Sequence, residues 1–282
     1  MDNALGDFLR SRRARLRPQD VGLVGYGPRR VPGLRREEVA RLAGVSVDYY
    51  VRLEQGRRGP AVSDSVLGAV ARALALDEVE RRHLFDLARP PAPRTPAQPA
   101  VRPGVRSVLD ALGGAPAFVL GRRMQVLAWN AVADALLGFS AVPGGYNAAR
   151  QIFLDPAART LFTRWEEEVA ADAVAFLRLD AGRHPDDPWL TALIAELSAG
   201  SSDFRALWAA HRVKDKTHGR KHLWHPATGA LDFAYESLTL PGDPDVLIVA
   251  YTAEPGSRTA QRIALLTELP APAMAGAGAG PG

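Results

Sequence analysis

The first 88 residues of the chain carry apolar residues at helical spacing, with one interruption rich in glycine and proline. The pattern predicts a basic amphipathic helix over 3–16 and a loop over 17–33. Four short helices are predicted next, over 35–43, 46–55, 63–75 and 77–88. Ser63 and Asp77 stand where the last two of these helices need N-caps. This part of the chain is therefore expected to contain helices joined by loops, with no strand.

Six prolines fall within 90–103, and they predict a semi-rigid, extended linker. Beyond the linker, short apolar runs predict strands over 117–121, 124–129, 219–225, 230–239 and 246–252. Leu231, Phe233 and Tyr235 alternate with polar or small residues, as in a strand with one buried face. Helices are predicted over 130–138 and over most of 155–212, with breaks near 184–188 and Gly200.

These patterns predict an α+β protein with an all-α head. Its regions are a helical domain over 1–89, a linker over 90–104, a mixed domain over 105–256, a C-terminal helix over 257–270 and a tail over 271–282. The tail is rich in alanine and glycine and is predicted to be disordered. The length of 282 residues suits one small and one medium domain.

Composition removes several classes of protein. The chain has no cysteine, which excludes a disulfide scaffold, a thiolate zinc site and a cysteine nucleophile. It has no apolar run near the ~20 residues that a membrane helix needs, and its N-terminus lacks an apolar signal core. We therefore expect a cytoplasmic protein with no membrane partner.

Positive charge is concentrated at one end of the chain. Residues 1–95 hold 18 of the 35 lysines and arginines but only 12 of the 31 acids. The rest of the chain is slightly acidic. The basic end therefore suits a polyanion as its partner.

The segment 35–60 has the pattern of a helix-turn-helix. Ala40 supplies the small residue that lets two helices approach closely, and Gly44 supplies the left-handed turn between them. Ser46 stands where the second helix needs an N-cap. The residues at inward-facing spacings are Val39, Val45, Tyr50 and Leu53. The same pattern also suits a plain helical bundle with a basic surface.

The opposite face of helix 46–55 is predicted to enter the major groove of DNA. Asp48, Arg52 and Gln55 share that face, with Val47 and Val51 beside them. On this interpretation Arg52 donates to guanine, Val47 contacts a thymine methyl and Asp48 accepts from cytosine or orients an arginine. Tyr49 reaches a phosphate or a base, and arginines at both ends meet the backbone. The predicted DNA-binding residues are Arg35, Arg36, Ser46, Val47, Asp48, Tyr49, Arg52, Arg57 and Arg58.

Residues 34–60 resemble the Xre/Cro-type helix-turn-helix family, and all of 3–89 is similar to its MmyB-like branch. The motif RRVPGLRREEVARLAGVSVDYYVRLEQGR carries the resemblance. It implies a lambda-repressor-like head and a sequence-specific transcriptional regulator. The loop 17–33 departs from compact phage repressors and matches the branch. Its Arg29 and Arg30 either touch DNA or lie in a solvated loop.

Residues 105–253 resemble the ligand-binding domain of MmyB-like regulators. The motifs are ALGGAPAFVLGRRMQVLAWNAVADALLG, FRALWAAHRV, KHLWHPATGALDFAYESL and DVLIVAYTAEPGS. The resemblance implies a PAS-like domain, with a five-stranded antiparallel sheet and helices over one face. It also implies a small apolar effector, fatty-acid-like in one interpretation. No cofactor beyond such an effector is expected.

The aromatic residues of this domain are candidate walls for an apolar ligand, and a few polar residues are candidate anchors. The predicted ligand-binding residues are Phe118, Trp129, Asn130, Phe162, Trp165, Trp208, His211, Arg212 and Phe233. Arg212 is suited to pair with a carboxylate. The alternative is that the aromatics only fill a core.

Neither a metal site nor a catalytic site is predicted. The histidines at 211, 218, 222 and 225 lack the spacing of a zinc motif. The sequence also lacks a GxSxG motif, a phosphate-binding loop and a GxGxxG motif after a strand. A non-enzymatic regulator is the prediction, with an enzyme controlled by a DNA-binding head as a disfavoured alternative.

We therefore expect a homodimer whose two recognition helices enter major grooves about 34 Å apart. It would be nucleoid-associated when bound to DNA. The C-terminal domain is expected to sense the effector and to mediate dimerisation. In the alternative, that domain only dimerises or binds a protein partner, with no small-molecule ligand.

Overall fold

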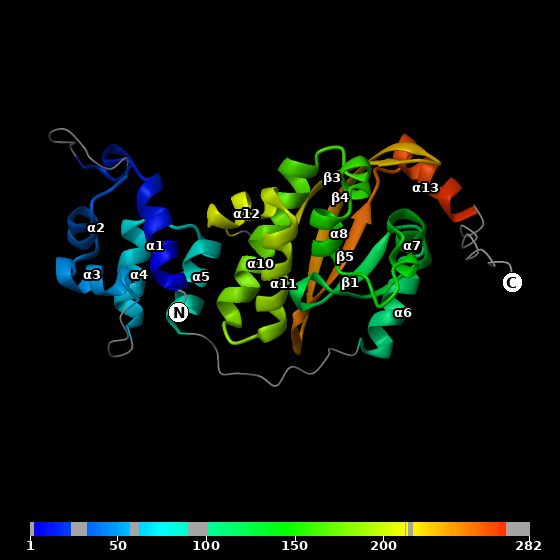
Figure 1. Cartoon of the computed structure of the whole chain (residues 1–282). Helices are drawn as coiled ribbons and strands as arrows, with labels where there is room; N and C mark the ends of the chain where they lie inside the picture. Colours follow the sequence, from blue (N-terminus) through cyan, green and yellow to red (C-terminus); the bar gives the residue numbers. More distant parts are fainter. Residues whose placement is uncertain are drawn as a thin grey trace, which may run out of the picture. The chain divides into compact units, whose positions relative to one another are not determined.

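The computed structural model describes residues 3–23, 33–56, 62–89, 101–211, 213 and 217–268. The chain forms two compact units, each built from two segments (Figure 1). The first unit comprises Met1–Pro96 and Ala170–Lys216, and the second comprises Ala97–Val169 and Thr217–Gly282. The linker residues 90–100 and the predicted tail 271–282 lie outside the described residues.

The first unit is helical over its described residues. Its N-terminal segment forms α1 (Ala4–Arg15), a 3-10 turn (Pro18–Val21), α2 (Arg36–Ala43), α3 (Val47–Glu54), α4 (Asp64–Ala73) and α5 (Glu78–Ala88). These helices confirm the sequence prediction to within a few residues. The side chains of Ser46, Ser63 and Asp77 each accept a backbone N–H as N-caps, as predicted.

Three later helices complete the first unit: α10 (Ala171–Arg183), α11 (Pro188–Gly200) and α12 (Ser202–Ala209). Leu179 of α10 belongs to the same buried core as Phe8, Tyr50 and Leu84. A segment that the sequence places in the region 105–256 therefore packs with the N-terminal helices.

The contact between α10 and α5 is close at Gly182. A Cβ added to Gly182 would lie 2.6 Å from the imidazole of His83. That ring is itself 2% exposed and packs edge-on against Phe8, with the ring centroids 5.1 Å apart. Since the ring has little room to move, position 182 accepts only glycine without repacking.

The second unit contains a five-stranded antiparallel sheet, which confirms the predicted architecture. Its strands are β1 (Ala117–Leu120), β2 (Val126–Trp129), β3 (His218–His225), β4 (Gly229–Leu240) and β5 (Asp243–Thr252). They lie in the order β2-β1-β5-β4-β3. Leu231, Phe233 and Tyr235 are buried and the residues between them are exposed, as the alternation predicts.

Short helices complete the second unit. They are α6 (Pro103–Ala111), η2 (Arg122–Met124), α7 (Ala131–Leu137), η3 (Phe139–Ala141), α8 (Ala148–Leu154), α9 (Ala157–Leu161), a π-helical turn over Trp165–Ala170 whose last residue belongs to the first unit, and α13 (Arg258–Glu268). Helix α6 was not predicted, because Pro103 was assigned to the linker over 90–104. Proline is also favoured in the first turn of a helix, and here it starts one.

Helices flank both faces of the sheet. Val105 and Leu109 of α6 pack with Val119 and Ile248 on one face. Phe118 points to the other face, where its ring contacts Phe139 of η3. The expectation of helices over one face alone is therefore too simple. None of the described helices has both the length and the apolar character needed to span a bilayer.

We expect Gly182→Ala to lower the free energy of unfolding by about 1–3 kcal/mol, because the added methyl group overpacks the contact with His83. Gly68→Ala is the matched control. It also lies inside a helix, but its nearest atom to an added Cβ is 3.6 Å away, at the tip of Arg72. That change should stabilise by about 0.5–1 kcal/mol. Urea denaturation of both variants would check the opposite signs, and equal effects would contradict the packing argument.

Candidate nucleic-acid interface and ligand pocket

The turn between α2 and α3 has the geometry that the sequence predicts. Gly44 is left-handed, with φ 66° and ψ 30°, and its N–H donates to the carbonyls of Ala40 and Arg41. Ala40 is fully buried at the helix contact. Ser46 Oγ accepts the N–H of Tyr49 at 3.2 Å and so starts α3. The bend and the cap therefore fix the direction in which α3 leaves α2.

The outer face of α3 is exposed. Val47 is 45% exposed, and Asp48, Arg52 and Gln55 are exposed beside it. The inward residues Tyr50 and Leu53 are buried. The Arg52 guanidinium lies 5.9 Å from the ring centroid of half-buried Tyr49. The predicted base-reading side chains thus share one accessible surface.

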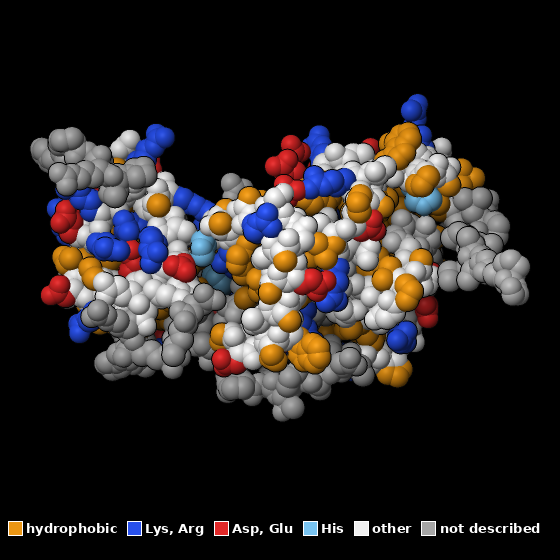
Figure 2. All heavy atoms as spheres, viewed as in Figure 1, with side chains coloured by type: hydrophobic (Ala, Val, Ile, Leu, Met, Phe, Trp, Pro, Cys, Tyr) orange, Lys and Arg blue, Asp and Glu red, His pale blue; other side chains and the backbone are white. Residues whose placement is uncertain are grey.

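The predicted backbone-contacting arginines have different surroundings. Arg35 is the N-cap residue of α2, and its side chain lies 3.5 Å from Glu37. Arg36 donates to Glu54 Oε1 from Nε at 3.2 Å and from Nη2 at 3.1 Å. Arg57 and Arg58 lie outside the described residues, as do Arg29 and Arg30. In Figure 2, arginine side chains gather over the region of α1 and α2.

Glu54, which the sequence analysis did not single out, holds the last turn of α3 in place. Its side chain has no exposed surface. Arg13 of α1 donates to it from Nη2 at 2.9 Å and from Nε at 3.2 Å. Arg36 adds its two bonds from α2, and Arg10 Nε lies 3.7 Å away. Asn3 Nδ2 also donates to the Glu54 backbone carbonyl at 2.9 Å.

The Glu54 carboxylate is charged in this setting. Burial by itself would raise its pKa, but the hydrogen bonds from Arg13 and Arg36 outweigh burial and lower the pKa below the ordinary value. The position of Glu54 relative to Tyr50 in the sequence was a signal that Glu54 is a buried acid with partners. Glu54 lies four residues after inward-facing Tyr50, on the buried side of α3, where an acid needs partners.

The predicted ligand anchors have structural partners of their own. Asn130 is buried and N-caps α7 by accepting the N–H of Ala133 at 3.0 Å. It also accepts from Ala117 N–H and donates to the carbonyl of Ala115. His211 Nδ1 lies 3.0 Å from Arg178 Nη1 in the first unit. Arg212 lies outside the described residues.

Most of the predicted aromatic walls pack against other rings. Phe118 contacts Phe139 and Tyr251, Trp129 contacts Phe139, and Phe233 contacts Tyr251. Trp165 Nε1 donates to the Ile152 carbonyl at 2.9 Å. Trp208 belongs to the first unit, where it stacks on Phe204 and lies 4.0 Å below the Arg178 guanidinium.

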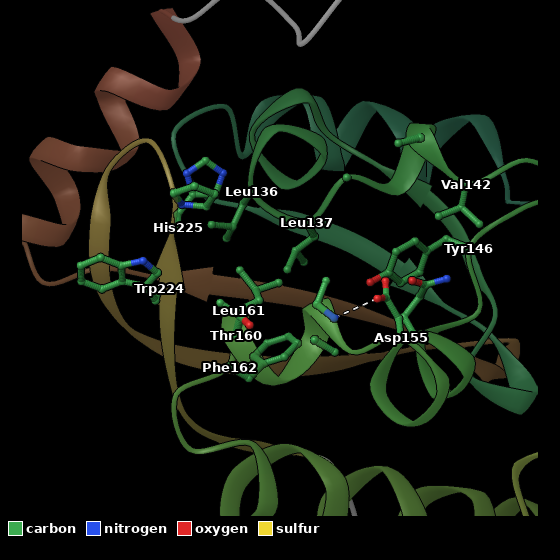
Figure 3. A pocket seen from close by; sticks show the side chains of 16 residues that line it. Leu136, Leu137, Val142, Tyr146, Asp155, Thr160, Leu161, Phe162, Trp224 and His225 are labelled. Atoms are coloured by element: carbon green, nitrogen blue, oxygen red, sulfur yellow. Dashed lines mark hydrogen bonds between the residues drawn. The ribbon is translucent and has the colours of Figure 1, made fainter. Parts of the chain in front are cut away.

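A pocket of about 550 Å³ lies in the second unit, between α7, the α8–α9 region and the end of β3 (Figure 3). Of the nine predicted ligand-binding residues, Phe162 is the one that lines this pocket. Leu136, Leu137 and Leu161 line its middle, with Trp224 and His225 toward one end and Tyr146 and Asp155 toward the other. The sequence analysis missed these residues because they come from separate loops and helices.

The clustered histidines have local partners. His222 Nδ1 lies 2.8 Å from Glu168 Oε1, and His225 Nδ1 accepts the N–H of Ala227 at 3.3 Å. Within the described ranges, no group of three or more histidine, aspartate or glutamate side chains is arranged to hold a metal ion.

Two families match the chain. The family described as "MmyB-like transcription regulator ligand binding domain" matches residues 101–266. The family described as "Helix-turn-helix domain" matches residues 4–84, which include α1 to α4 and most of α5. No curated protein matches the chain. The first match covers more than half of the sequence.

We expect Glu54→Gln to lower the free energy of unfolding by about 2–3 kcal/mol at pH 7, because a buried charged acceptor is lost while its arginines remain. Glu37→Gln is the control. That side chain is 62% exposed and its contact with Arg35 is 3.5 Å long, so the change should be within about 0.5 kcal/mol. Urea denaturation followed by circular dichroism measures both.

The pH dependence of stability, compared between the wild type and Glu54→Gln, is a second test of this role. A carboxyl with a lowered pKa in the folded state contributes its full stability above the ordinary pKa of about 4.3. That contribution disappears as pH falls through the lowered pKa of Glu54. The loss of stability in acid should therefore be smaller for Glu54→Gln than for the wild type. Parallel pH profiles would contradict the assigned role.

Proposed function

The chain belongs to the MmyB-like transcription regulators, and we propose that it binds an operator as a homodimer through α3 and responds to a small apolar effector. A helix-turn-helix head binds DNA, and the matched C-terminal domain binds a ligand. The effector is a regulatory ligand and takes no part in chemistry.

The observation that carries the proposal is the exposed polar face of α3. Asp48, Arg52 and Gln55 are accessible together. The helix that bears them is tied to α1 and α2 through Glu54. A rigid helix with an accessible polar face is what direct readout of base edges in the major groove requires.

The pocket in the second unit supports the proposal that the protein binds a small-molecule effector. Its volume of about 550 Å³ falls within the range of about 300–1,000 Å³ typical of ligand sites. Its middle is apolar, with polar groups at its ends. In the alternative proposal the C-terminal domain only dimerises or binds a protein. A fully packed domain would favour that alternative, and this cavity argues against it.

The packing of α10 and α12 supports communication between the ligand-binding domain and the head. Both helices lie within the matched ligand-binding domain, yet they pack in the same compact unit as α1 and α5. Buried Arg12 of α1 lies 3.2 Å from Glu80 and donates to the His211 carbonyl that follows α12. An effector regulates the protein only if it favours one arrangement of such contacts over another.

We expect Arg52→Ala to weaken binding to the cognate operator by about 1–3 kcal/mol and to relax the sequence preference at one base pair, because Arg52 would lose its hydrogen bonds to a guanine. Selection of genomic fragments by the intact protein, followed by sequencing, defines the operator. Arg81→Ala removes the same charge from an exposed position on α5 and should leave the preference unchanged. An Arg52→Ala variant that selects the same sites equally well would overturn the proposed readout.

We expect two chains to bind one operator duplex, with half-sites about one helical turn, or about 34 Å, apart. Sedimentation of the protein with a duplex carrying the selected site would give the stoichiometry. Inserting five base pairs between the half-sites rotates one by about half a turn, and should abolish two-chain binding. A single chain per duplex, or indifference to the insertion, would rule out the dimer model.

A further inference from the structure

One end of the pocket carries a carboxylate beside a phenol. Figure 3 shows Asp155 and Tyr146 next to each other, away from Trp224 and His225. Asp155 Oδ1 accepts the N–H of Ala157 at 2.9 Å. A carboxylate can accept about four hydrogen bonds, so Asp155 has capacity for a donor from a ligand.

The phenol keeps its proton beside this carboxylate. Burial, together with the negative charge of Asp155, raises the pKa of Tyr146 to about 12. Tyr146 therefore adds a neutral hydroxyl group and no positive charge to this end of the pocket.

No cation balances Asp155 among the described residues that line the pocket. None of the sixteen is lysine or arginine. His225 lines the pocket, but burial lowers its pKa from the ordinary value and so favours the neutral imidazole. Its Nδ1 already accepts the Ala227 N–H. The formal charge of the lining is therefore negative.

The rest of the lining suits an apolar body. Leu136, Leu137 and Leu161 face the space between the two ends, and Phe162 closes it from below in the view of Figure 3. Trp224 is 50% exposed at the far end. A ligand that fills this space is apolar for most of its length and polar where it meets Asp155 and Tyr146.

We propose that the effector is an amphipathic amine, whose protonated nitrogen donates to Asp155 and whose apolar body lies among the leucines. This proposal rests on the proposed function and names the class of effector at the same pocket. A primary amine is protonated at pH 7, like a lysine side chain. Its ammonium forms a charge-assisted hydrogen bond with a carboxylate.

A fatty-acid-like effector would bring a negative charge to the end of the pocket that already carries Asp155. Its carboxylate would face Asp155 with no lysine or arginine on the described lining to compensate it. Asp155 is exposed at this end of the pocket, so solvent weakens the repulsion between the two carboxylates but does not reverse its sign, and the affinity for a carboxylate falls. The pocket therefore discriminates by the charge of the polar end and tolerates variation in the apolar body.

The test compares three probes with the same chain length: octylamine, octanol and octanoate. Isothermal titration calorimetry with the full-length protein at pH 7 measures each Kd. We expect octylamine to bind most tightly, at least about tenfold better than octanoate. Because Asp155 is exposed, Asp155→Asn should weaken octylamine about three- to fivefold and leave octanol nearly unchanged.

Two further variants locate the effect. Asp110→Asn removes an acid of the same charge from an exposed position on α6 and should leave all three affinities unchanged. Leu161→Trp fills the middle of the pocket and should weaken all three probes together. Circular dichroism of each variant checks that it is folded.

The outcomes separate this inference from the proposed function. Three outcomes would each overturn the proposal that the effector is an amine. They are octanoate binding as tightly as octylamine, no binding of octylamine, and equal affinity for octylamine in the wild type and Asp155→Asn. If Leu161→Trp still weakens octanoate or octanol, the pocket remains the ligand site and only the class of effector fails. Operator selection with Arg52→Ala is done without any of the three probes, so it tests the DNA-binding head independently of the ligand.

Discussion

A charged side chain without solvent contact is costly unless other groups replace the water that it has lost. Glu54 is in that position at the end of α3, and the groups that replace water are arginines from α1 and α2. The carboxylate is satisfied only when all three helices are in their places. The orientation of α3 is therefore fixed by this ion cluster together with the buried apolar contacts of Tyr50 and Leu53.

The same cluster changes the role of one arginine. Arg36 was predicted to meet the DNA backbone, and its side chain is 44% exposed while it is bonded to Glu54. An arginine that is already held in a hydrogen-bonded geometry loses less conformational entropy when it meets a phosphate. Support of α3 and contact with DNA are thus compatible roles for Arg36. Substitution of Arg36 alone would mix the two effects.

Local elements were largely predictable from the sequence, because their signals are local. The left-handed turn at Gly44, the cap at Ser46 and the alternation through Phe233 and Tyr235 each involve a few neighbouring residues. At Asn130 the local signal suits two roles. A polar residue between a strand and a helix was predicted to be a ligand anchor, and the structure shows that it is the N-cap of α7.

Long-range arrangements were not predictable in this way. No pattern in the sequence says that Glu54 meets Arg13, 41 residues away, or that α10 packs on α5. Helix α10 is buried on more than one side, so its periodicity does not identify its partner. The pocket could not be predicted for the same reason. Only the tertiary fold brings together its lining residues, among them Leu137, Tyr146, Leu161 and Trp224.

The missing side chain at Gly182 restricts how α10 can move. Neighbouring positions on an α-helix are separated by a rotation of about 100°. Turning α10 about its axis would bring the Cβ of Ala181 or Arg183 toward the His83 ring, where the structure leaves no space for one. Rolling of α10 over α5 therefore requires this contact to repack, whereas a movement of the two helices together leaves it intact. The absence of a methyl group at position 182 thus favours joint movement of α10 and α5 over sliding between them.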